Sequence, residues 1–226
     1  MKPLQHQSGQ SMVEFNIALP FMMPIMLVIM MLIVQWAFIY SAKSTLDAAT
    51  ANAVREGTLN NGSLADIRQG LARGMMPLYA NGTTPADTFS ALARAVVATR
   101  VQSQITILNP NRSVFNRFRV RSRINGRNIY EIPNNNLMYR NPAPLPVDGN
   151  RRINIQDANL LQIEVRWCQR LIVPVANVVI REIVTDIWFR PSRDQLACNA
   201  LGLVTGDVYL AMTSQGLARM QTPFRM

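Results

Sequence analysis

Residues 9–40 read GQSMVEFNIALPFMMPIMLVIMMLIVQWAFIY, and this stretch decides how the rest of the chain is arranged. Its apolar run from Ile17 to Val34 contains no charged residue. Because a helix rises about 1.5 Å per residue, a helix from Ile17 to Tyr40 reaches about 36 Å, enough to cross a bilayer. We therefore predict one membrane-spanning helix, with Trp36 and Tyr40 at its far interface.

A cleaved secretory signal is the alternative to a membrane span. The apolar run is longer than the apolar region of a signal peptide, and Tyr40-Ser41-Ala42 is only a loose match to a signal-peptidase site. We therefore favour the span over the signal.

The chain beyond the span continues as an alanine-rich segment from Ser41 to Glu56. No helix-breaking residue lies between Pro24 and the end of this segment at Glu56. We predict that the membrane helix continues as a stalk to about Glu56, with Gly57 as its C-terminal stop.

The net charge of +10 lies beyond the span, since Lys2 and Glu14 are the only charged side chains before Lys43. A basic domain can bind nucleic acid, anionic lipid, an acidic wall polymer or an acidic protein. The alternative is that the arginines make ordinary surface ion pairs. Charge alone leaves both interpretations open.

The residue types needed for the common catalytic and metal sites are scarce. The only histidine is His6, ahead of the span, so the domain beyond it has neither a Cys/His zinc site nor a histidine-activated nucleophile. No phosphate-binding or dinucleotide-binding glycine motif is present. We expect no enzyme, no metal and no cofactor.

The two cysteines, Cys168 and Cys198, do not form a CxxC motif. In a domain outside a membrane, two isolated cysteines suggest one disulfide in an oxidising compartment. The alternative is two unrelated buried thiols.

Residues 117–124 read RFRVRSRI and alternate strictly. A strand with this sequence places four arginines on one face: Arg117, Arg119, Arg121 and Arg123. Asn125-Gly126 predicts a hairpin turn. A two-residue loop would place Val120 opposite Glu131; we favour a three-residue loop that pairs Arg119 with Glu131. The arginine face is either a docking surface for an anionic partner or a solvated strand that resists aggregation.

Other elements are predicted from caps and alternation. Helices are expected after Ser63, after Thr84 and from Pro174 to about Val184. The second is expected to bury Phe89, Leu92, Val96 and Val97. Strands are expected at 105–107, 161–167, 187–189, 207–212 and 217–220, with Cys198 in a loop.

The spacing from Gly9 to Glu14 is that of type IV pilin-like precursors. With Val13-Glu14-Phe15 and the later Ala53-Val54-Arg55-Glu56-Gly57, the chain resembles the TadE/TadF-like minor pilins (pseudopilins) of the tight-adherence, type IVb pilus. The resemblance implies that a prepilin peptidase cuts after Gly9, so that Gln10 begins the mature chain. Gly9, Gln10, Glu14 and Phe15 are then the processing residues. The new ammonium group of one subunit would pair with Glu14 of a neighbour.

The resulting prediction is an α+β protein with three parts: a leader at 1–9, a transmembrane and stalk helix at 10–57, and an extracytoplasmic head at 58–226. The resemblance implies a bacterial inner membrane location with the head in the periplasm. The expected partners are other pilin subunits in a hetero-oligomer, inner-membrane assembly proteins and the peptidase. Incorporation into the pilus and a TadE-type or TadF-type role stay open. The alternative function is an uncleaved membrane-anchored module whose arginine strand holds an anionic polymer.

Overall fold

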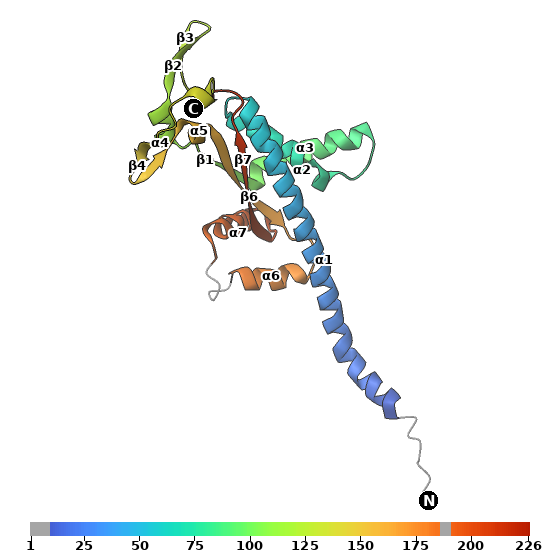
Figure 1. Cartoon of the computed structure of the whole chain (residues 1–226). Helices are drawn as coiled ribbons and strands as arrows, with labels where there is room; N and C mark the ends of the chain where they lie inside the picture. Colours follow the sequence, from blue (N-terminus) through green and yellow to red (C-terminus); the bar gives the residue numbers. More distant parts are fainter. Residues whose placement is uncertain (1–9, 186–190) are drawn as a thin grey trace, which may run out of the picture.

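The computed structural model describes residues 10–185 and 191–226 (Figure 1). A single helix, α1, covers Gln10–Leu59. The rest of the described chain, from residue 60 onward, forms a head beside the C-terminal part of α1, and the N-terminal part of α1 extends away from it (Figure 1). The head combines helices with antiparallel strands, which confirms the predicted α+β class.

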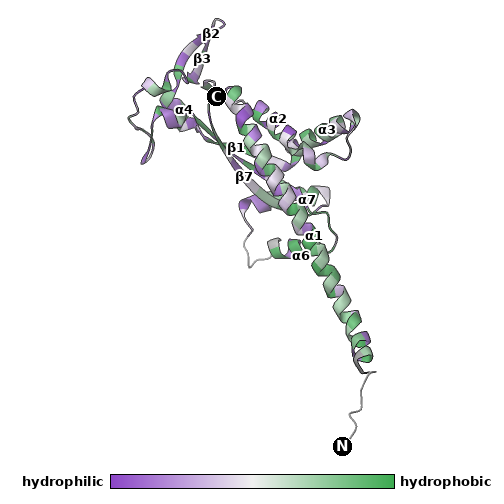
Figure 2. Ribbon diagram, turned by 45° about the vertical axis from the view of Figure 1, so that its right-hand side comes forward, coloured by the Kyte–Doolittle hydropathy of each residue, from purple (hydrophilic) through white to green (hydrophobic). Residues whose placement is uncertain are grey.

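The two parts of α1 differ in their surroundings. From Met12 to Val34 no side chain is buried, and this part is predominantly hydrophobic (Figure 2). From Gln35 onward one face lies against the head, through residues that recur at helical spacing: Gln35, Ala42, Leu46, Ala49, Ala53 and Val54. The helix therefore has an exposed apolar half and a half that forms part of the core.

The helix continues two residues past the predicted stop, to Leu59. Gly57 does not end it; a Cβ atom at Gly57 would lie 2.6 Å from Cγ1 of Ile67. The glycine is needed because another helix approaches at this point. The turn comes later, at Asn61 and Gly62, where φ is 58° and 76°.

The main sheet has the antiparallel order β1-β6-β7, with β1 at Ser103–Asn109, β6 at Leu160–Arg170 and β7 at Tyr209–Arg219. The alternation predicted for β6 is present, since Leu161, Ile163, Val165 and Trp167 are fully buried. Gly216 of β7 lies opposite Ile163 and touches α1, where a Cβ would stand 2.6 Å from Cγ2 of Val54. This face of the sheet therefore packs on α1.

On the other side, α1 packs against α2 at Leu64–Met75 and the short 3-10 helix η1 at Met76–Tyr79, and α3 at Pro85–Gln102 packs on these two. Their predicted starts are confirmed. Ser63 accepts a hydrogen bond from the Asp66 N–H, and Thr84 forms a capping box with Asp87.

The buried face of α3 differs from the prediction. Phe89 and Val97 are 75% and 62% exposed, and Leu92 and Val96 are only half-buried. The buried residues are small: Ala91, Ala95, Ala98 and Thr99. Small side chains are buried here because α3 packs closely against its neighbours.

A second sheet has the order β2-β3-β8, with β2 at Val120–Ile124, β3 at Arg127–Ile132 and β8 at Phe224–Arg225. The prediction of one strand from Arg117 is wrong, because Arg117 lies in the last turn of a helix, α4, at Arg112–Phe118. Asn111 starts that helix by accepting a hydrogen bond from the Val114 N–H at 2.9 Å. Arg119 follows as its C-cap.

The favoured register of the hairpin is also wrong. Val120 lies opposite Glu131 and Ile124 opposite Arg127, which is the two-residue loop. Asn125 and Gly126 have φ of 50° and 77°. Positive φ at both turn residues is the geometry that matches the right-handed twist of a hairpin, so the shorter loop is preferred.

The remaining elements lie mainly at the head's two ends: η2 at Leu137–Tyr139, β4 at Leu145–Asp148, β5 at Arg151–Ile153, α5 at Ile155–Ala158, α6 at Ala176–Thr185 and α7 at Arg193–Thr205. Cys198 lies in α7 and not in a loop, because Ser192 caps a helix there. The two predicted closing strands are one strand, β7. The strand predicted at 187–189 lies outside the described residues.

Candidate functional site

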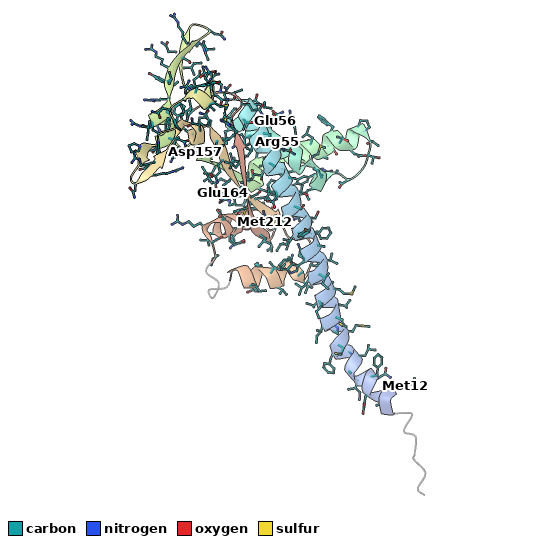
Figure 3. The ribbon with its side chains drawn as sticks, in the orientation of Figure 1. Met12, Arg55, Glu56, Asp157, Glu164 and Met212 are labelled. Atoms are coloured by element: carbon teal, nitrogen blue, oxygen red, sulfur yellow. A yellow bond between two sulfur atoms is a disulfide. The ribbon has the colours of Figure 1, made fainter. Side chains whose placement is uncertain are left out.

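The predicted processing residues fall at the start of α1. Gly9 lies outside the described residues, and Gln10 is the first residue of the helix. Glu14 and Phe15 are exposed on the helix surface. Figure 3 shows Met12 near the lower end of α1 and Arg55 and Glu56 near its upper end, beside the head.

The helix between these points has the properties of a membrane anchor. It is long and apolar enough to cross a membrane, and no residue of its most apolar 18-residue window is buried. The core helix of a soluble protein would be covered instead. From Glu14 to Gln35 the helix rises about 32 Å, close to the thickness of a bilayer's hydrocarbon core.

Gln35 marks the level at which the exposed half of α1 ends. Its side chain is buried, and its Oε1 accepts a hydrogen bond from the backbone N–H of Val173 at 2.9 Å. Val173 belongs to the segment that joins β6 to α6. A polar side chain in an apolar helix thus fixes the lower end of the head.

The arginine surface lies on the β2–β3 hairpin, at the end of the molecule away from the N-terminus (Figure 1). Arg121 lies opposite Tyr130, and Arg123 lies opposite Asn128. The guanidinium carbon of Arg119 stands 4.8 Å from the centroid of the Tyr130 ring, within the range of a cation–π contact. Arg119, Arg121 and Arg123 therefore share one face, and we call these three residues the hairpin arginines.

Among the described residues, none of the hairpin arginines forms an ion pair with a carboxylate. Glu131, which was expected to pair with Arg119, lies opposite Val120 and binds Arg225 at 3.0 Å. Arg117 is exposed on α4, outside the strand. The hairpin arginines thus present positive charge that this part of the chain leaves uncompensated.

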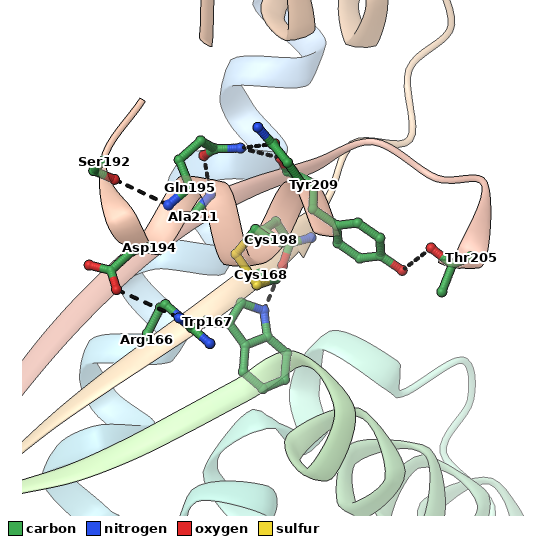
Figure 4. Close-up of a disulfide and its surroundings, with 12 residues drawn as sticks. Arg166, Trp167, Cys168, Ser192, Asp194, Gln195, Cys198, Thr205, Tyr209 and Ala211 are labelled. Carbon is green, nitrogen blue, oxygen red and sulfur yellow. Dashed lines mark hydrogen bonds and ion pairs between the residues drawn. A yellow bond between two sulfur atoms is a disulfide. The ribbon is translucent and has the colours of Figure 1, made fainter. Parts of the chain in front are cut away.

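The disulfide joins the sheet to α7 (Figure 4). Cys168 of β6 and Cys198 of α7 are bonded, with 5.4 Å between their Cα atoms. Gln195 adds two hydrogen bonds to β7, one to the carbonyl of Tyr209 and one from the N–H of Ala211, each at 2.9 Å. The helix is therefore held against the face of the sheet opposite α1.

The described residues contain no cluster of three His, Cys, Asp or Glu that could hold a metal ion. Glu164, a carboxylate on β6, accepts a hydrogen bond from the Gln215 amide at 3.0 Å on the neighbouring strand. Burial, and to a lesser degree the nearby Tyr209, raises the pKa of Tyr79 to about 12, so its hydroxyl stays neutral at physiological pH. The hydrogen bond to Gln215 gives Glu164 a structural partner.

Sequence reasoning missed two features of this region. Gln35 lies in an apolar segment and was not singled out, and only its bond to Val173 shows its role. Gly70 and Gly74 of α2 were not singled out either. A Cβ at Gly74 would lie 2.5 Å from the Cα of Ala49, so these glycines let α2 approach α1. Their spacing, combined with the alanines of the stalk, was the available signal.

Comparison with known families identifies the N-terminal part of the chain. Residues 9–55 match the family model described as TadE-like protein. This confirms the resemblance to TadE-like proteins over the anchor and most of the stalk; the head lies outside the match. No curated protein and no solved structure matches the chain.

Proposed function

We propose, from the similarity of residues 9–55 to TadE-like proteins, that this chain is a minor pilin of the tight-adherence pilus, cleaved after Gly9. The observation that carries the proposal is the apolar half of α1 from Met12 to Val34, in which no residue is buried, with Glu14 near its start and the first buried contact with the head at Gln35. A subunit of this shape can remain in a membrane through α1 or pack α1 against other subunits. A structural role fits better than a catalytic one.

Glu14 supports the cleavage step in particular. A carboxylate at the edge of a membrane helix is unfavourable unless it is paired or reaches water. Cleavage after Gly9 would create a positively charged amino terminus at Gln10, one helical turn before Glu14. In a bundle of staggered subunits, the new ammonium group of one chain can then bind Glu14 of the next.

The disulfide supports a periplasmic head. Disulfides persist in oxidising compartments, and the bacterial periplasm is one of them. The Cys168–Cys198 bond lies in the head, beyond the membrane helix. The orientation we propose is therefore residues 1–9 in the cytoplasm and the head in the periplasm of the inner membrane, where the partners are other pilin subunits, inner-membrane assembly proteins and the prepilin peptidase.

The cleavage step is tested by the N-terminal mass of the protein from cells that contain the peptidase. The wild-type chain should begin at Gln10, and Gly9→Val should retain residues 1–9. A wild-type chain that still begins at Met1 would refute the proposal.

The assembly step is tested separately. Glu14→Gln should be cleaved normally but should reduce crosslinking to other pilin subunits and piliation. Glu182→Gln, which removes an exposed carboxylate from the head, is the matched control and should leave both unchanged. Normal piliation of Glu14→Gln would exclude the charge pair.

The hairpin arginines favour a second candidate, an uncleaved anchored module that binds an anionic polymer. Their charges have no carboxylate partners among the described residues. Neutralising Arg117, Arg119, Arg121 and Arg123 separates the two functions. Loss of polymer binding with normal piliation would support the module, whereas normal binding would exclude it.

A further inference from the structure

The helix α6 has an unusual position for an element of the head. It lies below α7 and extends to one side of α1, with its first residues near α1 and its last residues away from it (Figures 1 and 2). The Val173 N–H just before α6 is bonded to Gln35, so its start is fixed to a known level of α1. Ala176, its first residue, is fully buried.

That level coincides with the expected surface of the bilayer. The apolar run begins at Ile17, and a helix rises about 27 Å from Ile17 to Gln35, against about 30 Å for a hydrocarbon core. Trp36 and Tyr40, which follow Gln35, are 67% and 77% exposed. Exposed tryptophan and tyrosine at the end of an apolar run are typical of the membrane interface.

The two sides of α6 differ in chemistry. Arg181 lines a groove between α6 and α7, together with Asn199, Gly202 and Leu203 of α7, so its side of the helix faces the head. Val179 and Ile183 each stand two residues from Arg181, which is about 200° around the helix axis. They therefore lie on the side of α6 opposite Arg181, where Val179 is half-buried. Ile183 is 52% exposed.

The segment before α6 extends the same apolar surface. Ile172 and Val175 are exposed, although both are large aliphatic residues. These exposed aliphatic side chains flank Val173, which is bonded to Gln35 of α1, whereas Arg181 and Glu182 of α6 form an ion pair with each other. This is the division of faces found in helices that lie on a membrane surface.

We propose that α6 is an interfacial helix, which lies in the boundary between headgroups and acyl chains of the outer leaflet and fixes the depth of the head. The occupant of its apolar side is the lipid surface, because the start of the helix is held at bilayer level by the bond between Val173 and Gln35, and the helix extends sideways from α1. The inference rests on α1 crossing the membrane. It requires neither cleavage after Gly9 nor pilus assembly, so its failure would leave the proposed function intact.

The test measures the depth of nitroxide labels in the full chain, reconstituted in vesicles of phosphatidylethanolamine and phosphatidylglycerol. Single cysteines are introduced as Ile183→Cys and Val179→Cys on the apolar side. The controls are Glu182→Cys, the neighbour of Ile183, and Val97→Cys, a similarly exposed aliphatic residue on α3. The native cysteines are bonded to each other and do not take the label.

Labels at 183 and 179 should collide more often with oxygen than with a water-soluble nickel chelate, at depths of about 5–10 Å below the headgroups. Labels at 182 and 97 should be open to the chelate. Equal access of the chelate to residues 183 and 182 would overturn the proposal. Protection of residue 183 that appears only when other pilin subunits are added would also overturn it, because the occupant would then be a neighbouring subunit.

Discussion

The side-chain oxygen Oε1 of Gln35 accepts a hydrogen bond from the backbone N–H of Val173, 138 residues later in the chain, at 2.9 Å. Gln35 is 1% exposed, although no residue from Met12 to Val34 is buried. This bond links α1 to the segment that leads into α6. It therefore fixes the lower end of the head at a defined level of α1.

Replacing Gln35 with leucine should destabilise this junction. The Val173 N–H would lose its acceptor in a partly buried site, which typically costs about 1–3 kcal/mol. Thermal unfolding in mild detergent should show a lower midpoint, and the segment around Val173 should be cleaved faster by protease. Trp36→Leu, a change at the exposed neighbouring position, is the control and should shift the midpoint little. Equal midpoints for Gln35→Leu and wild type would contradict the role of the bond.

Gly74→Ala should destabilise the contact between α1 and α2. Its Cβ would lie 2.5 Å from the Cα and 2.6 Å from the Cβ of Ala49, so the two helices must separate. Overpacking of this kind costs about 1–3 kcal/mol, which exceeds the gain of about 1 kcal/mol in helix propensity. Denaturant unfolding measures the net change in the free energy of unfolding that results from these two opposing effects.

The sign of the change decides this prediction. On an open helix surface the same substitution would stabilise the protein, because alanine favours the helix. A stabilised Gly74→Ala protein would show that the helices do not touch there. Gln69→Ala, at an exposed position of the same helix, controls for a general effect of alanine on α2.

Elements whose structure is determined by residues close together in the chain were predictable from the sequence. The alternation of residues 161–167 gave β6, the polar caps Ser63 and Thr84 gave two helix starts, and the uncharged run of residues 17–34 gave the anchor. In each case the residues that decide the structure are close together in the chain. The Cys168–Cys198 pairing followed from there being only two cysteines.

Features that depend on distant neighbours were not predictable. On α3, apolar residues including Phe89 were expected to be buried, but the adjoining elements lie so close that the buried residues are three alanines and Thr99. In RFRVRSRI the alternation continued into a helix end, because the cap at Asn111 lies outside the repeating pattern. For Gln35, the partner that explains its burial, Val173, lies 138 residues away in the chain. Burial between distant segments overrode local propensity at all three sites.

The hairpin arginines should contribute to binding of anionic polymers. Replacing Arg121 and Arg123 with glutamine should weaken binding to double-stranded DNA, used as a polyanion probe. Each lost phosphate contact should reduce the slope of log affinity against log salt by about 1. Arg94→Gln with Arg193→Gln removes two exposed arginines from other parts of the head and serves as the charge-matched control. Equal losses for the two double variants would mean that only net charge matters.

Loss of the disulfide should destabilise the protein and release α7 first. The bond closes a loop between residues 30 apart, and the chain-entropy relation gives about 3–4 kcal/mol for a loop of that size. Cys168→Ala with Cys198→Ala should therefore unfold at lower denaturant concentration. Hydrogen exchange should rise first in α7, because the two bonds from Gln195 to β7 are then its main remaining polar ties to the sheet.

A reductant separates the bond from the effect of the substitutions. Reduced wild-type protein should unfold like the double alanine variant, and the variant should not respond to the reductant. Gln195→Leu, which keeps the disulfide but removes both hydrogen bonds to Tyr209 and Ala211, should raise exchange at these positions while the rest of α7 stays protected. If the reduced protein keeps full protection in α7, the disulfide is not what holds this helix on the sheet.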